Sequence, residues 1–189
     1  MSTPNRTIET VFTRMEQRRE RNFLKRRAQT ASWLPSFRNQ PRRRLLVKLW
    51  TTGVIFMFFA AVLIAVGVLS DSAQPWLGLP WMLGTFAIMV VWIMLNITVD
   101  MIDSAPVACL DEYERKQVEG LRSFTYRVSL FLGLTGLLLL IFFGVWLMDV
   151  RPDWAAEVPY LVGIFATPVF LTITSLPTAV IAWNLTDID

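Results

Sequence analysis

Four long uncharged segments constrain this chain more than any other feature. Residues 49–70, 78–99, 128–148 and 160–183 contain no Asp, Glu, Lys or Arg. A bilayer core of about 30 Å is crossed by about 20 helical residues, because each residue advances the helix by about 1.5 Å. An α-helix also satisfies its backbone hydrogen bonds internally, as lipid requires. The sequence therefore predicts an all-α membrane protein with four transmembrane helices.

A soluble protein with four buried core helices is the alternative interpretation. In a chain of 189 residues, of which 54% are hydrophobic, too little polar chain remains to cover four such helices. Uninterrupted apolar runs of this length are also the standard signal of membrane spans. We therefore divide the chain into a basic arm, residues 1–48, and a transmembrane domain, residues 49–189.

The basic residues are distributed unevenly, and this predicts the orientation. The arm contains 13 Lys or Arg and 3 Asp or Glu, and the connection 100–127 adds four basic residues, whereas the other two connections contain only Arg151. Lys and Arg resist translocation, so both termini and the 100–127 connection are expected to be cytoplasmic. Arg outnumbers Lys by 15 to 3, which is typical of a GC-rich bacterial genome. We expect a multi-pass protein of the bacterial plasma membrane.

The arm itself predicts an interfacial element. Ile8, Val11, Phe12 and Met15 recur at helical spacing, which favours an amphipathic helix to about residue 27. Anionic phospholipids are the expected partner, at roughly 1 kcal/mol per basic residue near the surface. The predicted lipid contacts are Arg42, Arg43, Arg44 and Lys48. No nucleic acid partner is expected, because 48 residues that lead into a membrane span hold no recognised nucleic-acid fold.

The 100–127 connection predicts a helix that continues directly into the third span. Asp111 stands at its expected start, where a carboxylate caps free amides. Glu112 and Lys116, like Asp111 and Arg115, are spaced for ion pairs along a helix. A carboxylate site for a cation or for acid–base chemistry is the alternative, but no histidine accompanies these acids. A further hypothesis is that the basic arm folds against Asp111, Glu112 and Glu114.

Small residues inside the spans predict where helices pack, because close backbone approach is a principal source of association in lipid. The candidates are Gly53, Ala60 and Gly67 in the first span and Ser129, Gly133 and Gly136 in the third.

The fourth span contains Pro168 and Pro177 within a hydroxyl-rich segment. We expect prolines to kink it and nearby hydroxyls to bond the freed carbonyls, although a broken helix can also form a transporter site.

Several residue types that chemistry needs are missing from the sequence. The chain has no histidine and one cysteine, Cys109. The commonest general base is therefore absent. Histidine-ligated haem and the usual zinc and iron–sulfur sites lack their ligands. No ionisable residue lies deep in a span, where proton relays need one. We therefore expect no enzyme activity, no cofactor and no metal site.

Two segments carry a resemblance to known proteins. LDEYERKQVEGLRSFTYR before the third span and LPTAVIAWNLTD at the end of the fourth resemble small four-span actinobacterial membrane proteins of unknown function. Some of those resemble accessory subunits of the cytochrome bc–cytochrome oxidase supercomplex. The resemblance covers about thirty residues and transfers no site residues. It implies a non-catalytic accessory or assembly subunit that binds other integral membrane subunits, with a respiratory supercomplex as the specific expectation.

Two other functions fit the same sequence. The proline- and threonine-rich fourth span allows a small transporter or channel. The basic arm allows a membrane anchor that recruits a cytosolic protein.

Overall fold

The computed structural model of the chain describes residues 4–70, 75–150, 152–155 and 157–185. Within these ranges, side chains are described from residue 13 onward, except at 75, 148, 149, 153 and 155. All regular structure in these ranges is helical. In chain order the elements are α1 (Pro4–Thr30), η1 (Pro35–Phe37), α2 (Gln40–Leu69), η2 (Pro75–Leu77), α3 (Gly78–Thr98), η3 (Ile102–Ser104), η4 (Val107–Cys109), α4 (Glu112–Val150), α5 (Pro152–Ala155) and α6 (Val158–Asn184).

The four predicted spans are confirmed as helices that are long and apolar enough to cross a membrane. They are α2, α3, α4 and α6, so the chain is a multi-pass membrane protein. α2 starts at Gln40, which places the last basic residues of the arm on the same helix as the first span. α4 is a single helix of 39 residues, which confirms that the helix of the 100–127 connection continues into the third span.

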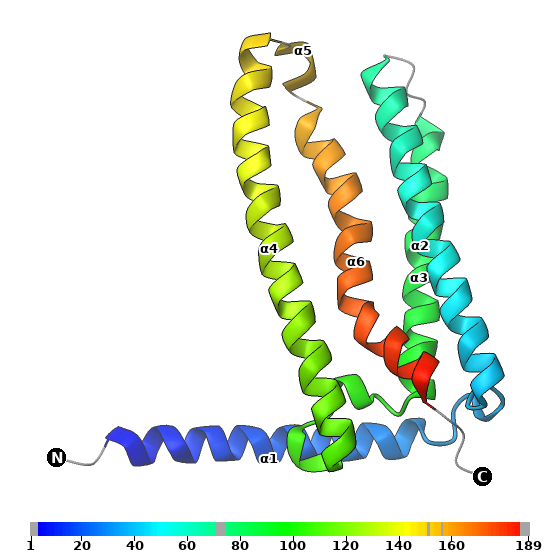
Figure 1. Cartoon of the computed structure of the whole chain (residues 1–189), viewed down its shortest axis with the longest axis vertical. Helices are drawn as coiled ribbons and strands as arrows, with labels where there is room; N and C mark the ends of the chain where they lie inside the picture. The colour runs from blue at the N-terminus through cyan, green and yellow to red at the C-terminus, as the bar shows by residue number, and fades with distance from the viewer. Residues whose placement is uncertain (1–3, 71–74, 151, 156, 186–189) are drawn as a thin grey trace.

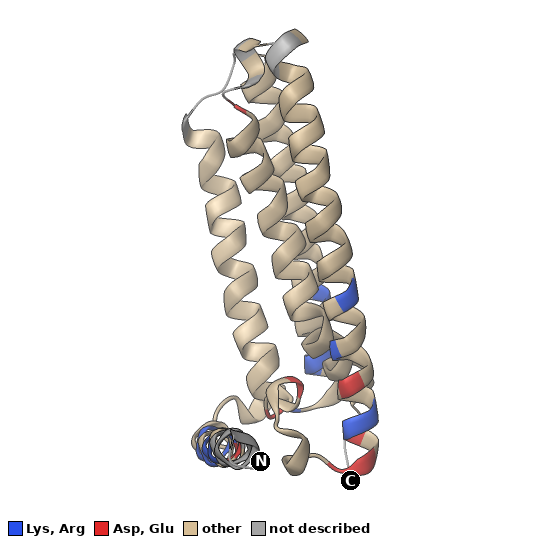
Figure 2. Ribbon diagram, turned by 90° about the vertical axis from the view of Figure 1, so that its left-hand side faces the viewer, with Lys and Arg blue, Asp and Glu red and all other residues tan. Residues whose placement is uncertain are grey.

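The spans run side by side, and α1 lies across one end of them (Figure 1). We name this end, where α1, η3 and the last turn of α6 meet, the arm end. Charged residues gather there and on the first part of α4, while the remaining lengths of the spans carry almost none (Figure 2). The helix predicted for the arm is confirmed. The side chains of Ile8, Val11 and Phe12 lie outside the described residues, and Met15 is exposed.

The main core lies in the half of the bundle nearest the arm end. There α2, α3, the connection after α3, the start of α4 and α6 contribute buried residues to one cluster: Leu46, Trp50, Met57, Ile88, Leu95, Val99, Ile102, Val118, Ala179, Ile181 and Ala182. A smaller cluster of Ala61, Ile64 and Ile164 joins α2 to α6 farther along. The bundle is therefore packed most densely where it meets the arm.

Two glycines set the close approach of α2 and α3. A Cβ built on Gly53 would lie 2.7 Å from Cγ1 of Ile88, and one on Gly84 would lie 3.2 Å from the ring of Phe56. Ala60 and Gly67 are also buried on α2. Because glycine has no side chain, the two helices can approach closely and make dispersion contacts there. In lipid, such packing takes the place of the hydrophobic effect as the attraction between helices.

α6 contains both Pro168 and Pro177 within one continuous helix. Its axis changes direction toward its C-terminal end (Figure 1). Hydroxyls of the preceding segment bond carbonyls one turn back: Thr172 Oγ1 donates to the carbonyl of Pro168 at 2.7 Å, and Thr174 Oγ1 to that of Phe170 at 2.8 Å. Such back-bonding bends membrane helices. The carbonyls that the two prolines leave without an amide donor are those of Ile164 and Ile173, four residues earlier. The described hydroxyls of α6 bond other groups, so the expectation that they bond the freed carbonyls is wrong.

The α2–α3 contact predicts a stability difference between two glycine substitutions. Gly53→Leu forces Ile88 or the helix backbones to move, so we expect a loss of about 1–3 kcal/mol, typical of overpacking. Gly144→Leu on α4 is the matched control, because no atom lies within 4 Å of a Cβ placed there. Thermal unfolding in detergent measures both variants. Equal melting temperatures would contradict the close α2–α3 contact.

Candidate functional site

Six charged residues of the arm end make contacts between elements, and we name them the arm-end cluster. They come from the arm, from the connection after α3 and from α4: Arg27, Arg38, Arg43, Asp100, Asp103 and Arg122.

The cluster is built on an unusual turn at the end of α3. Asp100 and Met101 both have a left-handed backbone, with φ of 53° and 57°. The amide of Met101 donates to the carbonyl of Asn96 and that of Asp100 to the carbonyl of Ile97, which is the Schellman pattern of a helix end. Glycine usually occupies the left-handed position, because a Cβ is strained there. An aspartate at this position therefore needs contacts that hold it.

Asp100 is held by the arm. Its carboxylate lies 3.0 Å from Nη2 of Arg38 and 3.7 Å from Nη2 of Arg27. Nη2 of Arg38 also donates to the carbonyl of Thr30 at 3.3 Å, at the last residue of α1. One carboxylate thus joins the end of α1, the segment after η1 and the end of the second span.

Asp103 and Arg122 join the same connection to α4 and α6. The hydroxyl of Thr178 on α6 donates to Oδ2 of Asp103 at 2.7 Å. Nη2 of Arg122 on α4 donates to the carbonyls of Asp103 at 2.6 Å and Ala105 at 2.8 Å. Thr178 is fully buried, so its hydroxyl would be costly without this partner.

Arg43 departs from its predicted role as a lipid contact. Only 4% of the residue is exposed. Nη2 donates to the carbonyl of Leu185 at 2.7 Å, and Nη1 donates to the carbonyl of Arg38. The side chain therefore ties the start of α2 to the end of α6. Nearby, the indole of Trp50 donates to Oγ of Ser175 at 2.9 Å and makes a second bond between these helices.

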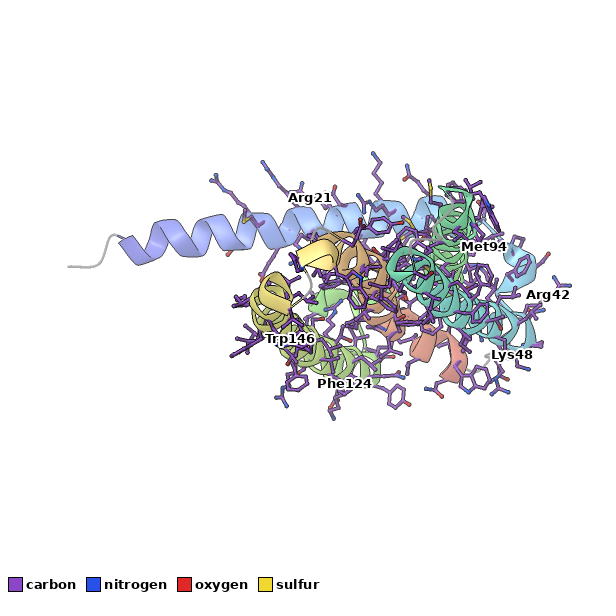
Figure 3. The ribbon with its side chains drawn as sticks, turned by 90° about the horizontal axis from the view of Figure 1, so that it is seen from above. Arg21, Arg42, Lys48, Met94, Phe124 and Trp146 are labelled. Atoms are coloured by element: carbon purple, nitrogen blue, oxygen red, sulfur yellow. The ribbon has the colours of Figure 1, made fainter. Side chains whose placement is uncertain are left out.

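The other three predicted lipid contacts are exposed. Arg42 and Lys48 belong to α2 and lie at the outer edge of the molecule (Figure 3). The guanidinium of Arg42 lies 5.9 Å from the centre of the Phe37 ring, and that of Arg44 lies 5.3 Å from the centre of the Trp183 ring. These aromatic neighbours orient both cations at the arm end.

The acidic start of α4 is a helix cap with surface ion pairs. The amide of Glu114 donates to Oδ1 of Asp111 at 2.7 Å, and the amide of Asp111 donates to Glu114 Oε2 at 3.3 Å. This is a reciprocal capping box. The predicted pair of Lys116 with Glu112 is confirmed at 2.9 Å.

Two other expectations for this segment need correction. Arg115 pairs with Glu119 at 3.0 Å instead of with Asp111, because the carboxylate of Asp111 caps the helix. The arm was expected to meet Asp111, Glu112 and Glu114. In the described part of the chain, its ion pairs to the rest of the protein go to Asp100.

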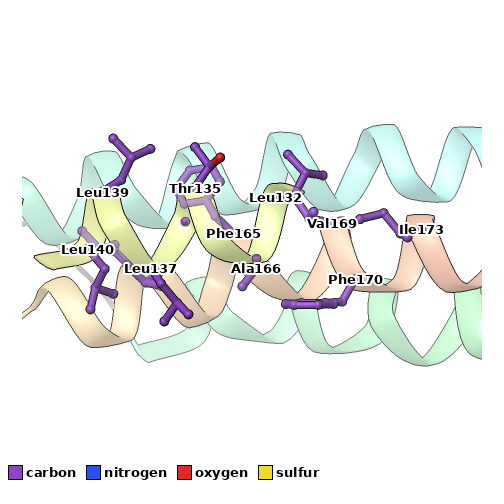
Figure 4. Close-up of a pocket in the computed structure, with 14 residues that line it drawn as sticks. Leu132, Thr135, Leu137, Leu139, Leu140, Phe165, Ala166, Val169, Phe170 and Ile173 are labelled. Carbon is purple, nitrogen blue, oxygen red and sulfur yellow. The ribbon is translucent and has the colours of Figure 1, made fainter. Parts of the chain in front are cut away.

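The small residues of the third span line an open groove. Gly133, Thr135 and Gly136 on α4 face Ala166 and neighbouring apolar residues of α6 across a volume of about 680 Å³ (Figure 4). No atom lies within 4 Å of a Cβ built on Gly133 or Gly136. Ser129 donates its hydroxyl to the carbonyl of Thr125 at 2.8 Å, within α4 itself. These residues thus make no close helix contact within the described chain.

The arm-end cluster joins elements through hydrogen bonds and ion pairs. The described residues contain no group of three or more His, Cys, Asp and Glu side chains placed to hold a metal ion. No protein-family model, curated protein or solved structure matches this chain. The site must therefore be interpreted from its own geometry.

Sequence reasoning missed Asp100, Asp103 and Arg122 as a unit. The signal available was the position of both aspartates directly after an uncharged span, where a carboxylate lies at the membrane boundary. Gly84 was also missed, because it belongs to no repeat of small residues.

The cluster predicts that a single charge holds the arm. Asp100→Asn keeps a residue that tolerates a left-handed backbone but removes the charge that attracts Arg27 and Arg38. We expect faster tryptic cleavage within residues 14–38 of the detergent-purified protein. Glu112→Gln is the matched control, because it removes one carboxylate from an exposed pair within α4. Unchanged cleavage of Asp100→Asn would contradict this role.

Proposed function

We propose that the chain is a non-catalytic subunit whose fourth helix, α4, packs against transmembrane helices of a larger membrane complex. The observation that carries the proposal is the exposure of α4. Along the most apolar 18 residues of α4, none is buried, whereas 44% of the corresponding stretch of α6 is buried. A helix with no buried residue along its most apolar stretch has surface available for a partner.

The way α4 is attached supports this assignment. At the arm end, Arg122 ties it to the connection after α3. At the other end, α5 lies between α4 and α6 in the chain and packs against α4. Between these points, α4 and α6 border the groove of about 680 Å³. α4 is thus anchored at both ends and accessible along its middle.

The composition of the groove favours a protein helix over lipid chains. Gly133, Gly136 and Ala166 are small residues at its surface. Lipid chains adapt to any apolar side chain, whereas a second helix gains from small residues because they allow its backbone to approach closely. Other integral membrane subunits are therefore the proposed partners. By the resemblance of the segments 110–127 and 176–187, a respiratory supercomplex is the first complex to test.

The proposed orientation has both termini in the cytoplasm of a bacterial cell. The even number of spans and the concentration of Lys and Arg at the arm end support it. Cys109 lies at the arm end, is partly exposed and is the only cysteine in the sequence. It therefore serves as a natural reporter of orientation.

We expect a membrane-impermeant maleimide to label Cys109 in inverted membrane vesicles and to leave it unlabelled in intact cells. The control is Cys109→Ser combined with Glu157→Cys, which moves the thiol to an exposed residue between α5 and α6. This variant should show the opposite pattern. Labelling of Cys109 from outside intact cells would contradict the proposed orientation.

A membrane anchor is a second candidate, and one observation favours it. α1 extends well beyond the bundle on one side (Figure 3), so its first turns are accessible to a cytosolic protein. A transporter centred on α6 is less well supported. Two of the α6 hydroxyls that could bind a substrate already have partners within the chain, because Ser175 accepts a bond from Trp50 and Thr178 donates one to Asp103.

The groove predicts which substitutions release the partner. Gly133→Leu combined with Gly136→Leu places two large side chains where a partner helix would approach. After gentle detergent extraction, we expect companions that co-purify with the tagged wild-type chain to fall at least about tenfold, equivalent to about 1.4 kcal/mol. Mass spectrometry of the companions measures the loss.

Gly144→Leu is the control and should retain the companions, because Gly144 lies on α4 outside the groove. Recovery of integral respiratory subunits would support the specific partner. Recovery of a soluble protein that is lost on deletion of residues 1–40 would favour the anchor. A homo-oligomer without companions would favour transport.

A further inference from the structure

A second pocket lies between α1 and the connection that follows α3. Its volume is about 230 Å³, and it is lined by the basic face of α1 on one side and by Met101, Ser104 and Pro106 on the other. We propose that this pocket binds the phosphate of an anionic membrane phospholipid. The inference is independent of the α4 groove and requires no partner protein.

Two arginines supply the anion-binding chemistry. Arg19 and Arg26 both line the pocket. They are seven residues apart, which is close to two helical turns and places them on one face of α1. Asn22 lies between them on the same face. A guanidinium presents its donors in a planar fork that matches phosphate oxygens.

The guanidiniums of these two arginines differ from those of the arm-end cluster in their contacts. Arg27, Arg38 and Arg122 bond a carboxylate or backbone carbonyls. Within the described part of the chain, the side chains of Arg19 and Arg26 make no ion pair and no hydrogen bond. Two exposed cations that line one pocket and make no ion pair favour a bound anion.

The opposite wall suits the part of a lipid next to its phosphate. Met101 and Pro106 are apolar, and the hydroxyl of Ser104 donates to the carbonyl of Met101 at 3.0 Å, so its oxygen can still accept a bond from a headgroup. Phe23 is 7% exposed and fixes α1 beside this wall. A volume of about 230 Å³ equals that of about eight waters, enough for a phosphate with part of its glycerol.

The depth of the pocket identifies a lipid as the source of the phosphate. α3 ends at Thr98, and Met101 and Ser104 follow within two turns. The pocket therefore lies at the boundary of the bilayer, where phosphates are concentrated. α1 lies across one end of the spans (Figure 1), which would place it in the plane of the headgroups. The outer surface of α3 exposes Met89, Val90 and Ile93, which provide an apolar surface for acyl chains.

The opposite face of α1 offers a matched control. Arg14 and Arg21 are also seven residues apart, are both exposed and lie roughly half a turn of the helix away from Arg19 and Arg26. Arg14→Gln with Arg21→Gln therefore removes the same charge from the same helix without touching the pocket. Native mass spectrometry of the full detergent-purified chain titrated with phosphatidylglycerol measures binding.

We expect Arg19→Gln with Arg26→Gln to weaken binding about 30-fold, since each basic residue near anionic lipid contributes a factor of about five. The Arg14 and Arg21 double variant should bind within about twofold of wild type. Arg19→Lys with Arg26→Lys should lose less than the glutamine pair, because charge remains while the planar fork is lost. Circular dichroism confirms that each variant is folded.

Three results would overturn the proposal. One is equal weakening by both glutamine double variants, which would mean that diffuse surface charge binds the lipid. Another is the absence of bound phosphatidylglycerol on the wild-type chain. The third is complete displacement of the lipid by glycerol 3-phosphate at the same concentration, which would identify the pocket as a site for a soluble phosphate ester.

Discussion

The turn at the end of α3 holds the arm end of this protein together. Two consecutive residues with side chains, Asp100 and Met101, adopt a backbone that normally needs glycine, at a cost of roughly 1–2 kcal/mol each. The cost is offset by contacts that only this geometry allows. The carboxylate of Asp100 meets the arm, and the following residues bond α4 and α6. One short connection therefore sets the positions of three other helices.

The lipid environment explains why a few polar contacts have so much effect. Apolar helices gain little from leaving lipid for each other, so their positions depend on hydrogen bonds and on close contacts at small residues. α2 and α3 have such contacts at Gly53 and Gly84. α2 and α6 are joined by Trp50 with Ser175 and by Arg43 with Leu185. α4 is tied to the rest of the chain near Arg122 and by α5, and it is accessible between these two points, where it has no such bond and no close contact at a small residue.

The spans could be predicted because the absence of charge over 20 or more residues has one common structural meaning. The helix from residue 112 and its Glu112–Lys116 pair also followed from local spacing. The arm-end cluster could not be predicted, because the pairing of Arg38 with Asp100 depends on a left-handed turn. Glycine is the usual sequence signal of such a turn, and it is absent there. Arg43 was misassigned for a related reason. Consecutive residues of a helix point about 100° apart, and only the tertiary structure decides which of three arginines faces inward.

The separation between a closed arm end and an open α4 has a consequence for binding. A helix that enters the groove would cover apolar residues of α4 and α6 and would leave the contacts of Asp100, Asp103 and Arg43 intact. No existing polar bond of the cluster has to break, so the full gain from close packing at Gly133 and Gly136 is available to the complex. The arm would keep its place at the membrane surface in both states. The proposed binding of headgroups by the basic arm and that of a partner helix by α4 therefore use separate parts of the fold and do not compete.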